Sequence, residues 1–146
     1  MAASSHWGMT PRESIEAECA RRGRQALVDG CASLLLGEDE DVEESLVTAL
    51  GGPGAGRALR NPDQQYWLRV WGARGLLWVW EDTALPAVLA AFGDDAWRVR
   101  EMAAKAVGRN LVGDALEALS ALFDDPVPRV RAAAMRAAAR ITAAGV

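Results

Sequence analysis

The sequence has few of the residues that carry most catalytic and metal chemistry. It contains one histidine, His6, and two cysteines, Cys19 and Cys31, among 146 residues. His6 falls in residues 1–9, which show no periodicity and which we expect to be a mobile tail, so nothing fixes its geometry for catalysis. The cysteines fall in predicted helix without a second Cys/His pair, which favours buried reduced thiols over a disulfide or a zinc ligand pair. We therefore expect no metal, no cofactor and no enzyme activity, because no nucleophile, base and orienting group recur at contact spacing.

Long hydrophobic runs and a large excess of one charge are also absent. No apolar stretch has the length of a membrane span, and the N-terminus lacks a basic segment followed by a hydrophobic one, so we expect a cytoplasmic protein. The composition, 51% hydrophobic and 25% charged, is that of a folded single domain. The net charge of −4 argues against a general polyanion binder, although a local basic stripe is compatible with it. Arginine is abundant and lysine occurs once, at Lys105, which is typical of a GC-rich bacterial genome.

Residues 10–50 predict a helical cap. Thr10 followed by Pro11 and Glu13 has the pattern of a helix N-terminus, in which Thr caps the helix and Glu bonds back to the cap. Apolar residues at helical spacing then continue to a glycine stop. Gly23 interrupts this pattern, and either a break between two helices or a close packing point in one helix accounts for it.

Two polar segments follow, and neither has the spacing of a ligand site. The acidic residues 38–41 indicate a solvated helix start, with Asp41 and Glu44 as a capping pair. Residues 51–60 are rich in glycine and resemble a phosphate-binding loop only superficially, because no strand precedes them and no Gly-Lys-Ser/Thr motif follows. A flexible connection, with at most a short helix at its end, is the favoured interpretation.

One helical pattern occurs three times at a fixed spacing. Leu68-Arg69, Val99-Arg100 and Val130-Arg131 follow one another at 31 residues, since 99 − 68 and 130 − 99 are both 31. A complete unit is predicted to contain helix A, a tight turn with Asp, and helix B, whereas the first unit has lost most of helix A to the glycine-rich connection. In the third unit, Asp114 and Glu117 form a third predicted capping pair. The predicted units are a partial repeat over 61–82 and repeats over 83–113 and 114–142.

A single pair of helices cannot bury its apolar faces alone, so such units must stack. The sequence therefore predicts an all-α fold: a short α-solenoid of about two complete and one partial helix pair, with the N-terminal helices as its cap. The C-terminal segment 132–139 is rich in alanine and has little polar covering. It favours a homodimer through the C-terminal Ala-rich repeat, with tolerance of a small Ala surface as the alternative.

The repeat pattern resembles the HEAT-repeat family, especially its short bacterial form related to the repeats of phycobilisome lyases. The resemblance rests on Asp94 followed by Val99-Arg100 and Ala103, and on the same residue types one repeat later. It implies stacked helix pairs, a binding surface rather than a catalytic site, and hydrogen bonds along the stack between the turn Asp and the Arg after Val. The implied structural ladder comprises Asp63, Arg69, Asp94, Arg100, Asp125 and Arg131, with Asp63 and Arg69 as its weaker member.

Helix B has a second face that carries cations and aromatic residues. At about 100° per residue, its small apolar residues share the packing face, and positions three and four apart share the other. Stacking places these positions in three parallel rows, which suit an acidic protein segment or a nucleic-acid backbone. The rows are Trp67, Trp71, Arg74 and Trp78; Arg98, Met102, Lys105 and Arg109; and Arg129, Ala133, Arg136 and Arg140.

Each part of this surface also has a structural interpretation. The tryptophans could fill the space left by the missing helix A, and the arginines could be a solvated face that Asp95, Glu101 and Asp124 neutralise in part. Weighed together, the rows favour a non-catalytic binding module for an unidentified protein or acidic peptide, with Trp and Arg as its strongest contacts. Nucleic-acid or phosphate-ligand binding through the same stripe is the alternative, which the acidic net charge and the small number of repeats disfavour.

Overall fold

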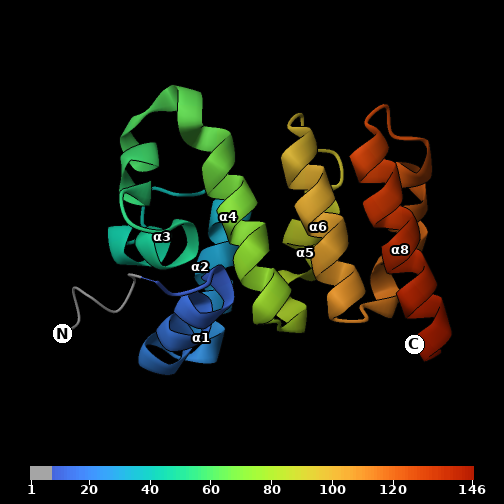
Figure 1. Cartoon of the computed structure of the whole chain (residues 1–146), viewed down its shortest axis with the longest axis horizontal. Helices are drawn as coiled ribbons and strands as arrows, with labels where there is room; N and C mark the ends of the chain where they lie inside the picture. The colour runs from blue at the N-terminus through green and yellow to red at the C-terminus, as the bar shows by residue number, and fades with distance from the viewer. Residues whose placement is uncertain (1–7) are drawn as a thin grey trace.

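The described residues, 8–146, form two layers of helices with a helical cap at the N-terminal end (Figure 1). The structure is a computed structural model, and the predicted tail residues 1–7, His6 among them, lie outside the described part of the chain. The α-helices are α1 (Pro11–Arg22), α2 (Arg24–Leu35), α3 (Glu44–Gly51), α4 (Gln65–Trp78), α5 (Leu85–Ala91), α6 (Trp97–Arg109), α7 (Leu116–Leu119) and α8 (Pro128–Ala144). Short 3₁₀ segments connect them: η2 (Ala55–Arg60), η3 (Pro62–Gln64), η4 (Asp82–Ala84), η5 (Gly113–Ala115) and η6 (Ser120–Asp124).

Helices α4, α6 and α8 lie side by side in one layer, each packed on the next (Figure 1). In the second layer, α5 packs against α6, while α7 and η6 pack against α8. The contact face of each helix B is small and apolar, as the repeat pattern requires, so Val99, Ala103 and Val130 are fully buried. The predicted all-α solenoid is therefore confirmed.

The first repeat has a helix A after all, and it comes from earlier in the chain. Helix α2 packs along α4 and also contacts α5, which is the place of helix A in the stack. A Cβ atom at Gly72 would lie 2.7 Å from the Cys31 carbonyl oxygen, so only glycine permits this approach. The interpretation that the glycine-rich connection had replaced this helix is wrong, because α3 and η2 are inserted between α2 and α4.

The N-terminal cap begins with the predicted capping box. Thr10 Oγ1 accepts from the Glu13 N–H at 3.1 Å, and Glu13 Oε1 accepts from the Thr10 N–H at 3.0 Å. Residues 11–37 contain two helices rather than one, because Gly23 adopts φ 99°, a value that residues with a Cβ rarely take. The break lets α2 turn away from α1 and join the solenoid.

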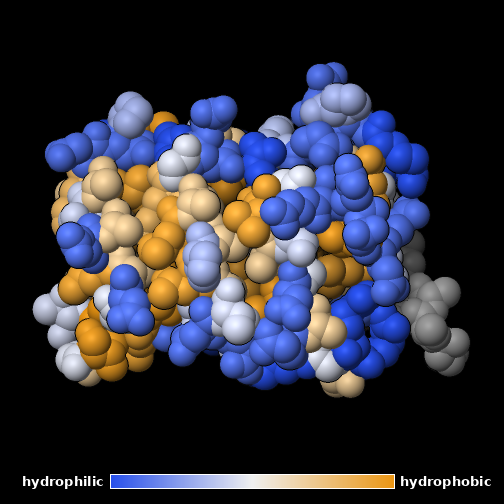
Figure 2. Space-filling view, turned by 180° about the vertical axis from the view of Figure 1, so that it is seen from behind, coloured by the Kyte–Doolittle hydropathy of each residue, from blue (hydrophilic) through white to orange (hydrophobic). Residues whose placement is uncertain are grey.

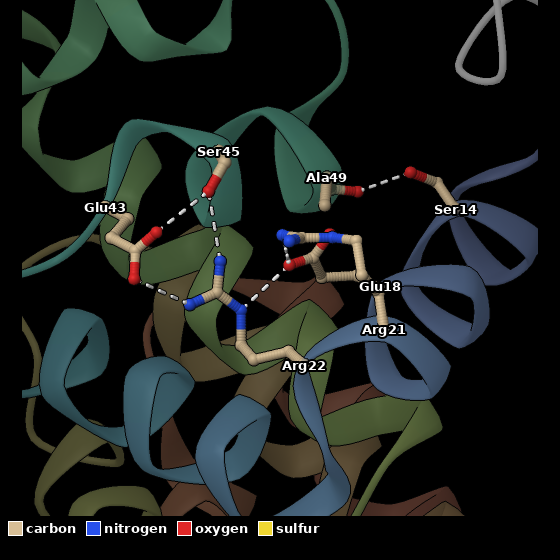
Figure 3. Close-up of polar contacts among 7 residues, drawn as sticks. All are labelled: Ser14, Glu18, Arg21, Arg22, Glu43, Ser45 and Ala49. Atoms are coloured by element: carbon tan, nitrogen blue, oxygen red, sulfur yellow. Dashed lines mark hydrogen bonds and ion pairs between the residues drawn. The ribbon is translucent and has the colours of Figure 1, made fainter. Parts of the chain in front are cut away.

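A polar network ties α1 to α3 across this cap (Figure 3). Arg22 donates to Glu18 at 2.8 Å within α1, to Glu43 at 3.3 Å and to the Ser45 hydroxyl at 3.1 Å. Glu18 is 6% exposed and also accepts from Arg21. These bonds compensate a buried carboxylate, so the network is a structural element of the cap.

The two other predicted capping pairs are wrong. Helix α3 begins at Glu44 after an extended Glu43, and no side chain caps it, because Glu43 turns toward Arg22 and Ser45 instead. Asp114 lies inside η5, and no side chain caps α7 either. In both places an acid stands three residues before a Glu, but the helix begins at another residue, so the acid is not at the N-cap position.

Candidate binding surface on the helix-B layer

Arginines of one repeat bind aspartates of the next along the stack. Arg69 Nε donates to Asp94 at 2.7 Å, and Arg100 Nε donates to Asp125 at 2.7 Å, each with a second bond from Nη2 at 3.2 Å. Each Asp also accepts a backbone N–H two residues on, which fixes the turn before helix B. The pairs are shielded, with side-chain exposures of 26% and 12% for the first and 13% and 5% for the second. These bidentate pairs set the register between repeats.

The two ends of this ladder differ from its middle. Arg131 donates to the Asp125 carbonyl oxygen, but among residues 8–146 it forms no ion pair with a carboxylate. Asp63 is exposed, and within that same range its carboxylate accepts none of the ladder bonds; its N–H donates to the Asn61 side chain. Asp63 therefore stands apart from the ladder, because no helix B with a matching Arg precedes it.

The N-terminal ends of α4, α6 and α8 carry an aromatic cluster, which we define as Trp67, Trp97, Arg98, Glu101 and Arg129. The Arg98 guanidinium lies 5.5 Å from the Trp67 ring centroid and 4.5 Å from that of Trp97, and Arg129 lies 5.2 Å from Trp97. Arg129 also binds Glu101 through two nitrogens, at 2.9 and 3.3 Å. The cations here are thus engaged by rings or by a carboxylate.

The remaining residues of the first row are partly covered by the cap. A Cβ atom at Gly51 of α3 would lie 2.7 Å from the Trp71 ring, and Trp71 stacks on Trp67 at 6.1 Å. Arg74 donates to the Leu50 carbonyl oxygen at 3.2 Å, and burial lowers the pKa of this guanidinium. Arg74 is therefore held by the cap. In the second row, Met102 is half-buried because it packs against the core.

Helices α6 and α8 border an open basic groove of about 220 Å³, which lies beside the C-terminal half of α6 and the middle of α8. Cations of the second and third rows form its two walls, and small residues form its floor, to which α4 contributes one leucine. The lining residues are Leu77, Lys105, Gly108, Arg109, Ala133, Arg136, Ala137 and Arg140. Four cations of the predicted rows, together with Ala133 of the third row, thus meet in one place, although the rows as a whole do not.

Among the four cations of this groove, only Lys105 lies near a carboxylate. Lys105 Nζ lies 3.9 Å from Glu101, a carboxylate that Arg129 already binds more closely. Arg109, Arg136 and Arg140 form no ion pair within residues 8–146; Arg109 lies over the Trp78 ring at 4.4 Å instead. The groove therefore has a local excess of positive charge in a chain of net charge −4.

Some residues of this surface were missed at the level of sequence. Trp97 belongs to the aromatic cluster, and Arg12 of α1 lies over the Trp78 ring at 4.8 Å. Glu101, in contrast, is an acid that the sequence indicates as able to neutralise part of the arginine face, and it binds Arg129. The 31-residue spacing could have indicated Trp97, because it aligns with Tyr66, which contacts Trp67 at 5.0 Å. No local pattern could have indicated Arg12, since its contact depends on how the cap folds back.

The described residues contain neither a group suited to a metal ion nor a membrane-spanning helix. No group of His, Cys, Asp and Glu in residues 8–146 is arranged to hold a metal ion. Cys31 is buried, and burial raises the pKa of its thiol to about 12, so it is not a thiolate nucleophile at neutral pH. Within the same part of the chain, no helix combines the length and apolar character that crossing a membrane requires.

Stacked helix pairs, tied by Asp–Arg bonds and presenting one helix of each pair on a common surface, define an α-solenoid of helical repeats. A family model described as HEAT repeats matches residues 53–139, more than half of the 146-residue chain. The chain therefore belongs to the HEAT-repeat family. Repeats of this family commonly mediate protein–protein interactions. Neither the search of curated proteins nor that of solved structures gave a match.

Proposed function

We propose that this chain is a non-catalytic binding module that holds an acidic segment of a partner protein on the helix-B layer. The observation that carries the proposal is the set of uncompensated arginines, Arg109, Arg136 and Arg140, gathered at one groove. Acids do not recur at the equivalent repeat positions, so the positive charge is not a by-product of surface salt bridges. Arginine suits this role because its planar fork binds carboxylates bidentately.

Two finer parts of the proposal rest on the sequence. The short repeat and its turn residues support a small adaptor related to the repeats of phycobilisome lyases, and the excess of arginine over lysine supports a bacterial origin. The cytoplasmic location stays a prediction. A homodimer through the C-terminal Ala-rich repeat stays a prediction, supported by Met135 of α8 at 52% exposed. Seen from behind, hydrophobic side chains gather over the C-terminal half of the molecule, whereas the N-terminal half is mostly hydrophilic (Figure 2).

Nucleic acid is the weaker candidate for the same surface. Its affinity grows with the number of neutralised phosphates, and the groove offers four cations, one of them near Glu101. Single-stranded binding also needs free aromatic faces for stacking, whereas Arg12 and Arg109 already lie over the Trp78 ring. An acidic peptide needs neither many phosphates nor an open ring.

Titration with two anionic ligands of equal charge tests the proposal. An acidic peptide and a short DNA duplex are added separately at low and moderate salt, and binding is followed by tryptophan fluorescence, since Trp78 lies beside Arg109. We expect saturable quenching by the peptide, weaker at higher salt, and little response to the duplex. Preferential binding of the duplex would replace the proposal by the nucleic-acid alternative, and no response to either ligand would refute both.

Two charge-reversal variants of equal net charge distinguish the effect of the groove's arginines on binding from the effect of the net charge of the chain. Arg109→Glu with Arg140→Glu should abolish peptide binding and leave the chain folded, because neither residue forms an ion pair within residues 8–146; the melting temperature should fall only by the small amount that the contact between Arg109 and the Trp78 ring contributes. Arg57→Glu with Arg60→Glu changes the net charge equally at exposed positions of η2 and should leave binding intact. Equal losses in both variants would mean that the acidic peptide responds to overall charge alone.

A further inference from the structure

The basic groove combines charge and apolar surface in an arrangement that narrows the kind of segment it can hold. Lys105 and Arg109 lie four residues apart on α6, and Arg136 and Arg140 lie four apart on α8, so each pair shares one helix face. The groove thus has a cationic pair on each wall rather than a single cluster. A ligand that uses both walls must present two anionic groups in opposite directions.

The floor between these walls is apolar and low. Gly108 and Ala137 meet so closely that a Cβ atom at Gly108 would lie 2.8 Å from the Ala137 Cα atom. Together with Ala133 and Leu77, they leave no polar side chain to bind at the bottom of the groove. An apolar side chain laid on this floor loses contact with water, at about 25 cal/mol per Å² of buried apolar area. A ligand with charge alone would leave the floor unused.

The groove is small and open to solvent, so it can hold only part of a larger ligand. Its volume of about 220 Å³ is below the range of roughly 300–1,000 Å³ typical of sites for drug-sized molecules and cofactors. It can take a few side chains of an extended peptide. In a polyproline II chain, which has three residues per turn, the two neighbours of a residue that points down are each rotated by about 120° from it, so one is directed toward each wall.

We propose that the groove between α6 and α8 binds an acidic–apolar–acidic tripeptide segment of a partner protein. The apolar side chain lies on Gly108, Ala133 and Ala137, one carboxylate is bound by Lys105 and Arg109, and the other by Arg136 and Arg140. The inference rests on the proposed function and deepens it, because it assigns binding to one end of the helix-B layer and states the pattern of the ligand. The aromatic cluster then contributes little to this contact, because it lies at the N-terminal ends of α4, α6 and α8, whereas the groove lies farther along α6 and α8.

Two isomeric peptides test the pattern. Both are short, labelled and flanked by Gly and Ser; one contains Glu-Leu-Glu, and the other contains Leu-Glu-Glu, so that composition and charge are the same. We expect the first to bind the wild-type chain at least tenfold more tightly in fluorescence anisotropy. Equal binding would mean that the groove responds to charge alone and would overturn the assigned pattern. Tighter binding of a Gly-phosphoserine-Gly peptide than of Glu-Leu-Glu would overturn it as well, in favour of a single phosphate.

Variants at the two ends of the layer locate the contact. Arg136→Ala with Arg140→Ala should weaken Glu-Leu-Glu binding at least tenfold, whereas Arg98→Ala in the aromatic cluster should change it less than twofold. Arg136 and Arg140 are exposed, so thermal melting should show both variants folded. The reverse ranking would refute the groove as the site and leave the proposed binding function standing. Failure of every acidic peptide to bind would instead refute the proposed function itself.

Discussion

Replacing Arg100 by alanine tests whether the ladder stabilises the stack. The guanidinium donates to both carboxylate oxygens of Asp125, at 2.7 and 3.2 Å, and to the Asp94 carbonyl oxygen at 2.7 Å. The two side chains are 13% and 5% exposed, so little water can replace the lost bonds. In Arg100→Ala, the Asp125 carboxylate therefore stays nearly buried with two bonds fewer.

The expected loss in the free energy of unfolding depends on the interactions that Asp125 retains in Arg100→Ala. Leaving one partner of a buried ion pair alone costs about 3–5 kcal/mol, and one hydrogen bond to a charged group contributes about 1.5–3 kcal/mol. Asp125 still accepts the Val127 N–H at 2.9 Å, and Arg131 remains close to it. We therefore expect a loss of about 1.5–3 kcal/mol in the free energy of unfolding, or a melting temperature lower by about 3–12 °C for a chain of this size.

Urea denaturation followed by circular dichroism measures this loss, and a double-mutant cycle with Asp125→Asn assigns it to the pair. Arg69→Ala is the matched control, because its ion pair with Asp94 is more exposed, at 26% and 12%, and should cost less. An unchanged denaturation midpoint in Arg100→Ala would show that the ladder contributes no net stability. A full loss in which the cycle finds no coupling would assign the effect to the bonds with the Asp94 carbonyl instead.

Two further predictions concern the packing of the same stack. Burial alone would raise the pKa of Asp125, but hydrogen bonds from Arg100 and the Val127 N–H bring it below the ordinary value of 3.8. The ionised Asp125 therefore stabilises the folded chain above about pH 4, and this contribution is lost as the pH falls through the lowered pKa. The difference in unfolding free energy between the wild type and Asp125→Asn should accordingly shrink on acidification. A constant difference down to about pH 2 would contradict this. Gly72→Ala should destabilise by about 1–3 kcal/mol, offset in part by helix propensity, because its Cβ would lie 2.7 Å from the Cys31 carbonyl oxygen. Gly93→Ala is the control, with its nearest contact at 3.6 Å, and equal melting temperatures for the two variants would refute the close approach of α2 and α4.

The solenoid could be predicted because its signals are local and repeated. The turn Asp, the Val-Arg pair and the small residues of helix B recur at one spacing, so each copy supports the interpretation of the others. The position of α2 could not be predicted in this way. It stands as helix A of the first repeat although α3 and η2 separate it from α4, and only the backbone turn at Gly23 directs it there. A discontinuous repeat leaves no fixed spacing in the sequence.

For the candidate surface too, local spacing predicted which residues share a helix face, but not which of them are paired in the folded chain. The helical angle placed Lys105 with Arg109 and Arg136 with Arg140, and the structure brings these four residues to one groove. Which cations are compensated depended on a single acid, because Glu101 binds Arg129 from the neighbouring helix. The residues equivalent to Glu101 in the other repeats are Val70 and Ala132, so the repeat pattern does not predict an acid at this position.

The distribution of acids along the repeats explains why one end of the surface keeps its charge. The turn aspartates recur in every repeat, so each inner Arg of the ladder is matched by the next copy. Glu101 occurs once and lies near the middle of α6, where it reaches Arg129 and Lys105 but not the C-terminal turn. Arg109 in the last turn of α6 and Arg140, about one turn before the end of α8, occupy equivalent repeat positions without any acid of their own, and the end of α6 favours the cation at Arg109. The charges of the ladder and those of the groove are separated along the helix axis, so the ladder can be mutated without altering the groove, and the groove without altering the ladder.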